Sequence, residues 1–404
     1  MTTHLLDYDI DRVRAHFPML QSGLAFFDGP GGSQTPQPVA AAIAAALTGG
    51  LSNRDRMSST GRAADDIVLA ARAAIADLLG ADRRGVIFGR SMTSLTYELA
   101  RTLAKQWAPG DEVVVTSLDH DANIRPWVQA AEAVGATVRW AEFDPRSAEL
   151  PVAAVTGQLS DRTRLVAVTA ASNLVGTRPD IAAISAAAHG VGALVYVDGV
   201  HLTPHAYVDV TAIGADFFAA SPYKFLGPHL GTVVADPTLL ESLRPDKLLP
   251  SDDVVPERFE LGTLPYELLA GVTAAVDFLA GLLPGAGARR ERIRASMMAL
   301  ETYEDRMRLR LEGGLRSCPG VRLHANAARR TPTLLFSVGD TPSGEVAGRL
   351  TTAGINAPAG SFYALEASRR LGLGDGGAVR AGIAAYTCEA DVDRLVQAVR
   401  AVTR

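Results

Sequence analysis

The chain has 404 residues and a formal net charge of −5 at pH 7, with 48% hydrophobic and 21% charged residues. These values are ordinary for a folded globular protein and exclude extensive intrinsic disorder. The acidic balance argues against a nucleic-acid partner, and two cysteines are too few for a disulfide framework or a multi-cysteine metal centre. A chain of this length predicts two domains, or one large domain with a smaller lobe.

Two segments bear on cellular location. The first 17 residues carry acidic side chains and no long apolar region, so no signal peptide is expected. Residues 268–284 are apolar but include Asp277 and are short for a membrane span, which predicts a buried helix. We therefore expect a cytoplasmic protein that has no membrane partner.

Short apolar runs alternate with alanine-rich helical segments over the first 240 residues. Near-continuous hydrophobic strands separated by helices are typical of a mostly parallel sheet with helices on both faces. Helices are expected at residues 123–135 and 181–190. The pattern predicts seven strands, at residues 86–88, 112–116, 138–143, 164–169, 193–198, 216–219 and 232–235.

After about residue 265 the pattern changes to longer helices and a few strands. The predicted helix at 288–311 interleaves acidic with basic residues, which indicates a solvated face rather than a nucleic-acid stripe. The other expected elements are helices at 266–283 and 391–402 and strands at 331–338 and 378–385. We predict an α/β fold with a large domain at residues 19–275 and a smaller α+β domain at residues 276–404, joined by residues 1–18.

Polar residues follow successive strands of the predicted sheet, at the edge where α/β proteins bind ligands. Asp198 closes the most hydrophobic strand, and Lys224 follows the next strand 26 residues later (224 − 198 = 26). A buried carboxylate needs a cationic partner or hydrogen bonds. Pyridoxal 5'-phosphate requires a lysine for its aldehyde and a carboxylate for its pyridinium nitrogen. Each residue alone is common in structural roles, but the pair suits this cofactor.

Four segments together resemble the class V aminotransferase family of fold type I pyridoxal phosphate enzymes. They are SLDHDANIRPW, TAASNLVGT, DGVH with SPYK, and RFELGT, and the likeness extends from about Phe26 to the last helix. Within the family the chain is similar to the cysteine desulfurases. The resemblance implies the fold type I architecture, the cofactor, an amino-acid substrate and a homodimer with shared active sites.

The resemblance also implies roles for residues around the cofactor ring. Lys224 would bind the cofactor covalently and move protons at the substrate Cα, and Asp198 would pair with the pyridine nitrogen. His120 would stack on the ring. His201 would bond the phenolic oxygen, at a position where relatives usually have glutamine.

Four further residues would contact the phosphate. Thr93 and Ser221 would offer hydroxyl groups, in the setting of a helix N-terminus that favours anions. Met92 stands where the family often has a threonine, so it would contact the phosphate through its backbone. Thr263 would reach the phosphate of the neighbouring subunit.

The region before Arg380 departs from the desulfurase pattern. By resemblance, Arg380 would bind the substrate carboxylate through two of its guanidinium nitrogens. Asn173 would lie near that carboxylate and the cofactor oxygen, and so would also help to bind the cofactor. In desulfurases the sulfur-accepting cysteine lies on the loop before this arginine, but here Tyr363 stands at about that place and the loop has no cysteine. Cys318 falls in a predicted turn and Cys388 at the start of the last helix, so neither is expected to accept sulfur.

The expected function is β-elimination from a cysteine-like amino acid by a carbon–sulfur lyase. Cysteine desulfurase, aminotransferase and epimerase activities stay open, because they share the same first steps. A nicotinamide-dependent oxidoreductase would carry the glycine-rich dinucleotide-binding motif at the turn after the first strand, and this motif is missing here. A non-catalytic binding protein that retains the fold would be expected to have lost Lys224 or Asp198, and both residues are present. The histidines lack metal-ligand spacing, so no catalytic metal is expected.

Overall fold

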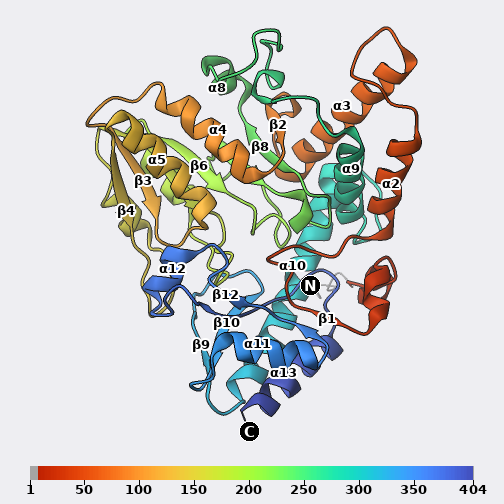
Figure 1. Cartoon of the computed structure of the whole chain (residues 1–404), viewed down its shortest axis with the longest axis vertical. Coiled ribbons are helices and arrows are strands. Elements are labelled where there is room, and N and C mark those ends of the chain that lie inside the picture. The colour runs from red at the N-terminus through yellow and green to blue at the C-terminus, as the bar shows by residue number, and fades with distance from the viewer. Residues whose placement is uncertain (1–7, 404) are drawn as a thin grey trace, which may run out of the picture.

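A seven-stranded sheet forms the centre of the larger part of the molecule (Figure 1). The computed structural model describes residues 8–403, and in it the strand order is β2-β8-β7-β6-β5-β3-β4. Strands β3 to β7 are parallel, whereas β8 is antiparallel to both of its neighbours. The mostly parallel seven-stranded sheet is thus confirmed, and its strands are β2 (Val86–Gly89), β3 (Glu112–Thr116), β4 (Thr137–Ala141), β5 (Thr163–Thr169), β6 (Leu194–Asp198), β7 (Phe217–Ala220) and β8 (Gly231–Ala235).

The two faces of this sheet contribute to two separate hydrophobic clusters. In β3, Val113 and Val115 pack into one cluster and Val114 into the other, as the two-residue period of a strand requires. Both faces are buried, so the strands are hydrophobic throughout. One face is covered by α4 (Met92–Ala104) and α5 (Arg125–Val134), and the other by α3 (Ser59–Leu79), α7 (Ile181–Gly190) and α9 (Tyr266–Ala280).

Helices α2 (Gln37–Thr48), α3 and α9 lie side by side at one edge of the molecule (Figure 1). From there α10 (Arg289–Arg316) runs toward the C-terminal part of the chain. The sequence predicted that this helix would end at residue 311, but it continues through Gly313 and Gly314. A Cβ atom at Gly314 would lie 2.5 Å from Val396 of α13 (Glu389–Val402), so the glycine allows the two helices to pack closely.

A four-stranded antiparallel sheet, of order β12-β13-β10-β9, forms the C-terminal part. Its strands are β9 (Val321–Leu323), β10 (Thr333–Val338), β12 (Ala359–Gly360) and β13 (Ala378–Gly382), and α11 (Ser343–Thr352) packs beside them. Strand β1 (Ala25–Phe26) pairs in parallel with β11 (Ile355–Asn356), so an N-terminal segment joins this part.

The remaining elements are short. They are α1 (Ile10–Arg14), α6 (Val152–Thr156), α8 (Pro237–Ser242), α12 (Leu365–Arg370) and the 3-10 turns η1 (Pro18–Ser22), η2 (Arg83–Gly85), η3 (Asp121–Asn123), η4 (Pro222–Lys224) and η5 (Glu257–Phe259). No helix in the described part of the chain has the length and apolarity needed to cross a membrane. The domain bounds stay a prediction, and the predictions that concern residues 1–7, a missing signal peptide among them, fall outside the described residues.

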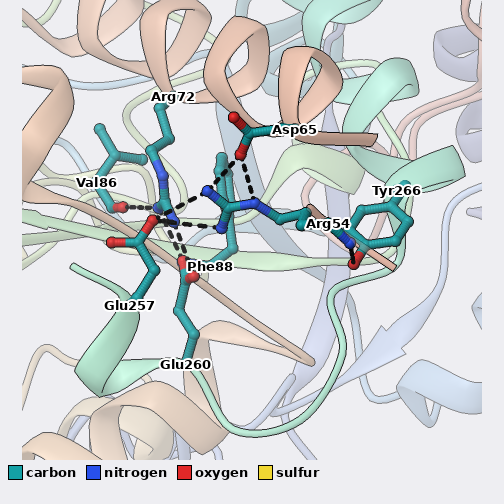
Figure 2. Close-up of polar contacts among 8 residues, drawn as sticks. All are labelled: Arg54, Asp65, Arg72, Val86, Phe88, Glu257, Glu260 and Tyr266. Carbon is teal, nitrogen blue, oxygen red and sulfur yellow. Dashed lines mark hydrogen bonds and ion pairs between the residues drawn. The ribbon is translucent and has the colours of Figure 1, made fainter. Parts of the chain in front are cut away.

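A buried arginine joins α3 to the segment that precedes α9 (Figure 2). The Nη1 and Nη2 atoms of Arg72 each donate a 2.8 Å hydrogen bond to one carboxylate oxygen of Glu260, and both side chains are under 5% exposed. Glu260 also accepts a 2.9 Å bond from the backbone N–H of Phe88. Arg54 extends the network, with Nη2 2.7 Å from Asp65 and 3.3 Å from Glu257. The network therefore connects α3, β2 and the loop that leads to Thr263.

We predict that Arg72→Met destabilises the fold by about 3–5 kcal/mol, because it leaves the buried Glu260 carboxylate without its cationic partner. The shift of the urea unfolding midpoint measures this effect. The matched control is Arg349→Met, which removes an ion pair to Glu345 whose side chains are 53% and 50% exposed. That pair is worth about 0–1 kcal/mol, and equal shifts for both variants would contradict the prediction.

Candidate active site

A cavity of about 560 Å³ opens at the carboxyl ends of the parallel strands. His120 follows β3, Asn173 follows β5 and Lys224 follows β7, while Arg380 faces them from β13. A smaller hollow of about 60 Å³ lies deeper and shares His120, Asn173 and Lys224 with the main cavity. This is the sheet edge at which the sequence predicted a ligand.

Lys224 belongs to η4, the single turn that follows β7. Its Nζ donates a hydrogen bond to the carbonyl oxygen of Pro30. Burial lowers the pKa of Lys224 to about 7, and the Arg380 charge adds to this, whereas Asp198 opposes it. A large share of the amine is therefore unprotonated, and so nucleophilic, at neutral pH. The chain has three lysines, and Lys224 is the one that lines the cavity.

Asp198 is the last residue of β6 and lines the deep hollow. Its Oδ1 accepts a 3.0 Å hydrogen bond from the backbone N–H of Val200. Burial raises the pKa of Asp198 to about 6, although this hydrogen bond and the Lys224 charge act in the opposite direction. The carboxyl group is thus able to hold a negative charge opposite a bound cation at neutral pH.

His120 immediately precedes the η3 turn as its N-cap, and it lines the cavity. Its Nδ1 accepts a 3.0 Å bond from the Ala122 N–H, and its ring stacks on Tyr363 with centroids 5.5 Å apart. Burial lowers the pKa of His120 to about 3, with smaller contributions from Lys224 and Arg380, so the imidazole is neutral. A neutral, fixed ring is suited to stacking on an aromatic ligand.

The neighbouring Asp119 is a buried residue that received no predicted role from the sequence. Its Oδ1 accepts a 2.6 Å bond from Asn123 Nδ2, and Oδ2 contacts the Thr116 hydroxyl. Burial raises the pKa of Asp119 to about 8, and the Asp198 charge raises it further. Asp119 is therefore largely protonated at pH 7 and adds little charge beside Asp198.

The start of α4 forms one end of the hollow, where Met92, Thr93 and Ser221 lie together. Ser91 caps this helix: its hydroxyl accepts a 3.1 Å bond from Ser94 N–H. The first turn thus points its free N–H groups at the hollow, which is the arrangement that binds phosphate. The close approach of β8 requires Gly231, because a Cβ there would lie 2.1 Å from the Met92 nitrogen.

Arg380 closes the opposite side of the cavity and is only 2% exposed. Its Nη1 donates a 2.8 Å bond to the Asn173 carbonyl, and its Cζ lies 3.7 Å from the ring centroid of Phe362. Burial lowers the pKa of Arg380 to about 9, while Asp28 raises it. The guanidinium Nε has no hydrogen-bond partner in the described chain, so the group retains unused donor capacity.

The loop before Arg380 adopts a strained conformation. Phe362 and Tyr363 have φ angles of 52° and 59°, in the left-handed region that bulky residues avoid. Hydrogen bonds hold both residues: Asn173 Nδ2 donates to the Phe362 carbonyl at 2.9 Å, and Asp121 N–H donates to the Tyr363 carbonyl at 2.7 Å. In this conformation the Phe362 ring lies against Arg380 and the Tyr363 ring against His120.

The structure brings together most of the predicted site residues. Thr263 is the exception, because it lies on an exposed loop between η5 and α9 and does not line the cavity. Three lining residues were not predicted from the sequence, namely Tyr97, Arg125 and Tyr223, although the motifs DHDANIRPW and SPYK contain the last two. The residues that do line the cavity or its hollow are Met92, Thr93, His120, Asn173, Asp198, His201, Ser221, Lys224 and Arg380.

Comparison with known proteins agrees with this geometry. A model of the family described as aminotransferase class-V matches residues 25–395. An uncharacterised protein of Mycobacterium tuberculosis is 36% identical over 97% of this chain and 98% of its own length. A cysteine desulfurase of Dickeya dadantii is 30% identical over 98% of this chain and 97% of its own. The solved cysteine desulfurase CsdA of Escherichia coli has a TM-score of 0.85 and 26% identity, over 97% of this chain and 98% of that one.

The fold is that of the fold type I pyridoxal phosphate enzymes, as predicted. The chain belongs to the class V aminotransferase family and is a pyridoxal phosphate-dependent enzyme. The residues present fit this cofactor, since a buried carboxylate, a lysine amine and a helix N-terminus surround one hollow. Among residues 8–403, no group of three or more His, Cys, Asp or Glu side chains is placed to hold a metal ion.

We predict that Lys224 is the most readily acylated lysine of the cofactor-free protein at pH 7. An ordinary lysine stays protonated up to about pH 10, whereas the pKa of Lys224 is lowered to about 7. Trace labelling with isotopic acetic anhydride from pH 5 to 11, read by peptide mass spectrometry, should show Lys224 reactivity rising around pH 7. Lys105, which is paired with Asp246, is the internal reference. A rise only near pH 10 would contradict the lowered pKa.

Proposed function

We propose that this enzyme is a carbon–sulfur lyase that eliminates a sulfur group from Cβ of a cysteine-like amino acid. The main support for this proposal is the composition of the cavity wall, because none of the described residues that line it is a cysteine. Tyr363 is on the loop before Arg380, where the resemblance to desulfurases leads one to expect the thiol. A phenol cannot accept sulfur as a persulfide, so sulfur leaves as sulfide or a thiol.

The two cysteines of the chain support this choice. Cys318 is buried at the end of α10, where its Sγ contacts the Gly314 carbonyl at 3.4 Å. Cys388 begins α13 beside Asp391, and burial raises the pKa of its thiol. A raised pKa disfavours the thiolate, which is the sulfur-accepting form. Sulfur transfer therefore has no suitable acceptor at the cavity wall.

Two residues perform the proton chemistry in this proposal, and a third holds the cofactor ring. When bound, pyridoxal phosphate supplies an electron-accepting ring that stabilises negative charge at the substrate Cα. Lys224 would bind the cofactor aldehyde, and its Nζ would take the Cα proton of the substrate. Asp198 would hold the proton on the ring nitrogen, and His120 would stack on the ring. The lowered pKa of Lys224 suits a base that works at neutral pH.

The remaining predicted residues bind and orient. Arg380 and Asn173 hold the substrate carboxylate, and His201 bonds the phenolic oxygen of the cofactor. Thr93, Ser221 and the Met92 backbone hold the phosphate. We also propose that Thr263, exposed on its loop, completes the phosphate site of a partner subunit, so that the working unit is a homodimer with shared sites. The cytoplasmic location stays a prediction.

The products distinguish this proposal from its alternatives. With cysteine, elimination and hydrolysis yield pyruvate, ammonia and sulfide in equal amounts, so pyruvate and sulfide should accumulate together. A desulfurase yields alanine and a protein persulfide, a transaminase requires an oxo-acid acceptor, and an epimerase retains the amino acid. Separate assays of pyruvate, sulfide and alanine with cysteine, cystine and alanine as substrates make the test. Alanine from cysteine, with a persulfide on Cys388, would overturn the proposal, and unchanged turnover of Cys388→Ser would support it.

Lys224→Ala should abolish the covalent link to the cofactor. The purified wild-type enzyme is expected to be yellow and to lose this colour with borohydride, which fixes the cofactor to Lys224. The variant should show no borohydride-fixed cofactor and a fall in pyruvate formation of about 10²–10⁴-fold, the range of general acid–base catalysis. Lys105→Ala is the matched control. Fixed cofactor in Lys224→Ala would show that another amine holds it.

A further inference from the structure

His201 separates the deep hollow from two buried threonines. It follows β6 and is 2% exposed. Its Nε2 lies 3.0 Å from the Thr331 hydroxyl and 3.1 Å from that of Thr333, at the start of β10. Its Nδ1 is buried and has no hydrogen-bond partner in the described chain, although the residue lines the hollow. One ring nitrogen is thus held by protein hydroxyl groups, and the other is left for a ligand.

The hydroxyl hydrogens decide which nitrogen carries the proton. Within the described chain, His201 Nε2 is the one hydrogen-bond partner of the Thr333 hydroxyl, and Thr333 is fully buried. The Thr331 hydroxyl has a second acceptor, the Gly176 carbonyl at 3.3 Å. If Nε2 carried the proton, the Thr333 hydrogen would lack an acceptor, at a cost of about 1–3 kcal/mol. If Nδ1 carries it, both hydroxyl groups are satisfied.

The surroundings of His201 favour the neutral ring. Burial lowers its pKa well below the ordinary value, and the neighbouring His205, Lys224 and Arg380 lower it further. His205 lies with its ring centroid 5.2 Å from that of His201, and its Nδ1 is 2.9 Å from the buried Glu304. A neutral imidazole carries one ring proton, so donating from Nδ1 requires Nε2 to accept.

We propose that Thr333, assisted by Thr331, positions His201 as an Nδ1–H donor toward the phenolic oxygen of the cofactor. This inference rests on the role proposed above for His201. The glutamine usual at this position has an amide that always offers a donor, whereas histidine offers one at Nδ1 only in the correct tautomer. The two threonines favour the Nδ1–H tautomer because their hydroxyl groups contact Nε2.

The first test measures the tautomer directly and needs no cofactor. In protein labelled with ¹⁵N-histidine, long-range ¹H–¹⁵N correlation spectra distinguish Nδ1–H, Nε2–H and doubly protonated rings, and His201→Gln identifies the His201 signals. We expect neutral His201 with the proton on Nδ1 at pH 7 to 8. Thr333→Val should move the proton wholly or partly to Nε2, and Thr333→Ser should restore it to Nδ1. An Nε2–H or doubly protonated ring in the wild-type protein would overturn the proposal.

The second test measures how the tautomer of His201 affects the absorption of the bound cofactor, in the enzyme without substrate. A donor at the phenolic oxygen stabilises the deprotonated chromophore, so losing it should raise the pH midpoint of the visible absorption change. We expect a rise of about 0.5–1 pH unit in Thr333→Val, which corresponds to one hydrogen bond. Thr333→Ser should return the midpoint to the wild-type value.

Thr177→Val is the matched control for both tests. Thr177 is 2% exposed, close to Thr331, and its hydroxyl has no partner among the described residues. Replacing it removes a buried threonine hydroxyl of the same kind without touching His201, so the tautomer and the midpoint should not change. Equal shifts in Thr177→Val and Thr333→Val would show a packing effect and overturn the proposal. If Thr333→Val fails to fold, Thr333→Ala removes the same hydroxyl group in its place. The tautomer result does not depend on the reaction, so a failed lyase assay leaves it intact.

Discussion

The site depends on one constraint: Lys224 and Asp198 face the same hollow with little water around them. In a low dielectric the charged form of each group is disfavoured, so the pKa of the lysine falls to about 7 and that of the aspartate rises to about 6. Their mutual attraction acts against both shifts. The amine is therefore available as a nucleophile under conditions in which ordinary lysines are fully protonated, while the carboxylate stays able to face a cation.

The register of the parallel sheet creates this arrangement. Asp198 of β6 pairs with Ala219 of β7, and Lys224 follows five residues after Ala219, in the η4 turn (224 − 219 = 5). The carboxylate and the amine thus leave the sheet at the same edge. The Gly231 contact brings the N-terminus of α4 to this edge from the antiparallel side of the sheet. Asp198, Lys224 and the N-terminus of α4 lie close together because the sheet fixes the ends of the neighbouring strands β6, β7 and β8 relative to one another.

The C-terminal part of the chain completes the cavity with a loop whose backbone is held by hydrogen bonds to the seven-stranded part. Phe362 and Tyr363 are held in left-handed conformations by hydrogen bonds to Asn173 and Asp121, residues of the seven-stranded part. A strained loop of this kind persists only where its surroundings determine it. Here the hydrogen bonds offset the strain, and the aromatic rings lie against Arg380 and His120. The cavity wall therefore depends on contacts between loops of the seven-stranded part and a loop of the C-terminal part.

The sequence by itself determined the strands, because their hydrophobic runs differ from the observed strands by at most two residues in the seven-stranded sheet. It also indicated the cofactor, since an aspartate and a lysine at successive strand ends suit pyridoxal phosphate and lie within motifs that resemble the family. The antiparallel direction of β8, the extension of α10 through two glycines and the strained Phe362–Tyr363 loop were decided only by the tertiary structure. So were the shifted pKa values and the hydroxyl partners of His201, because burial and side-chain contacts depend on residues far apart in the chain. Local patterns specify elements, whereas desolvation and hydrogen-bond partners exist only once those elements have packed together.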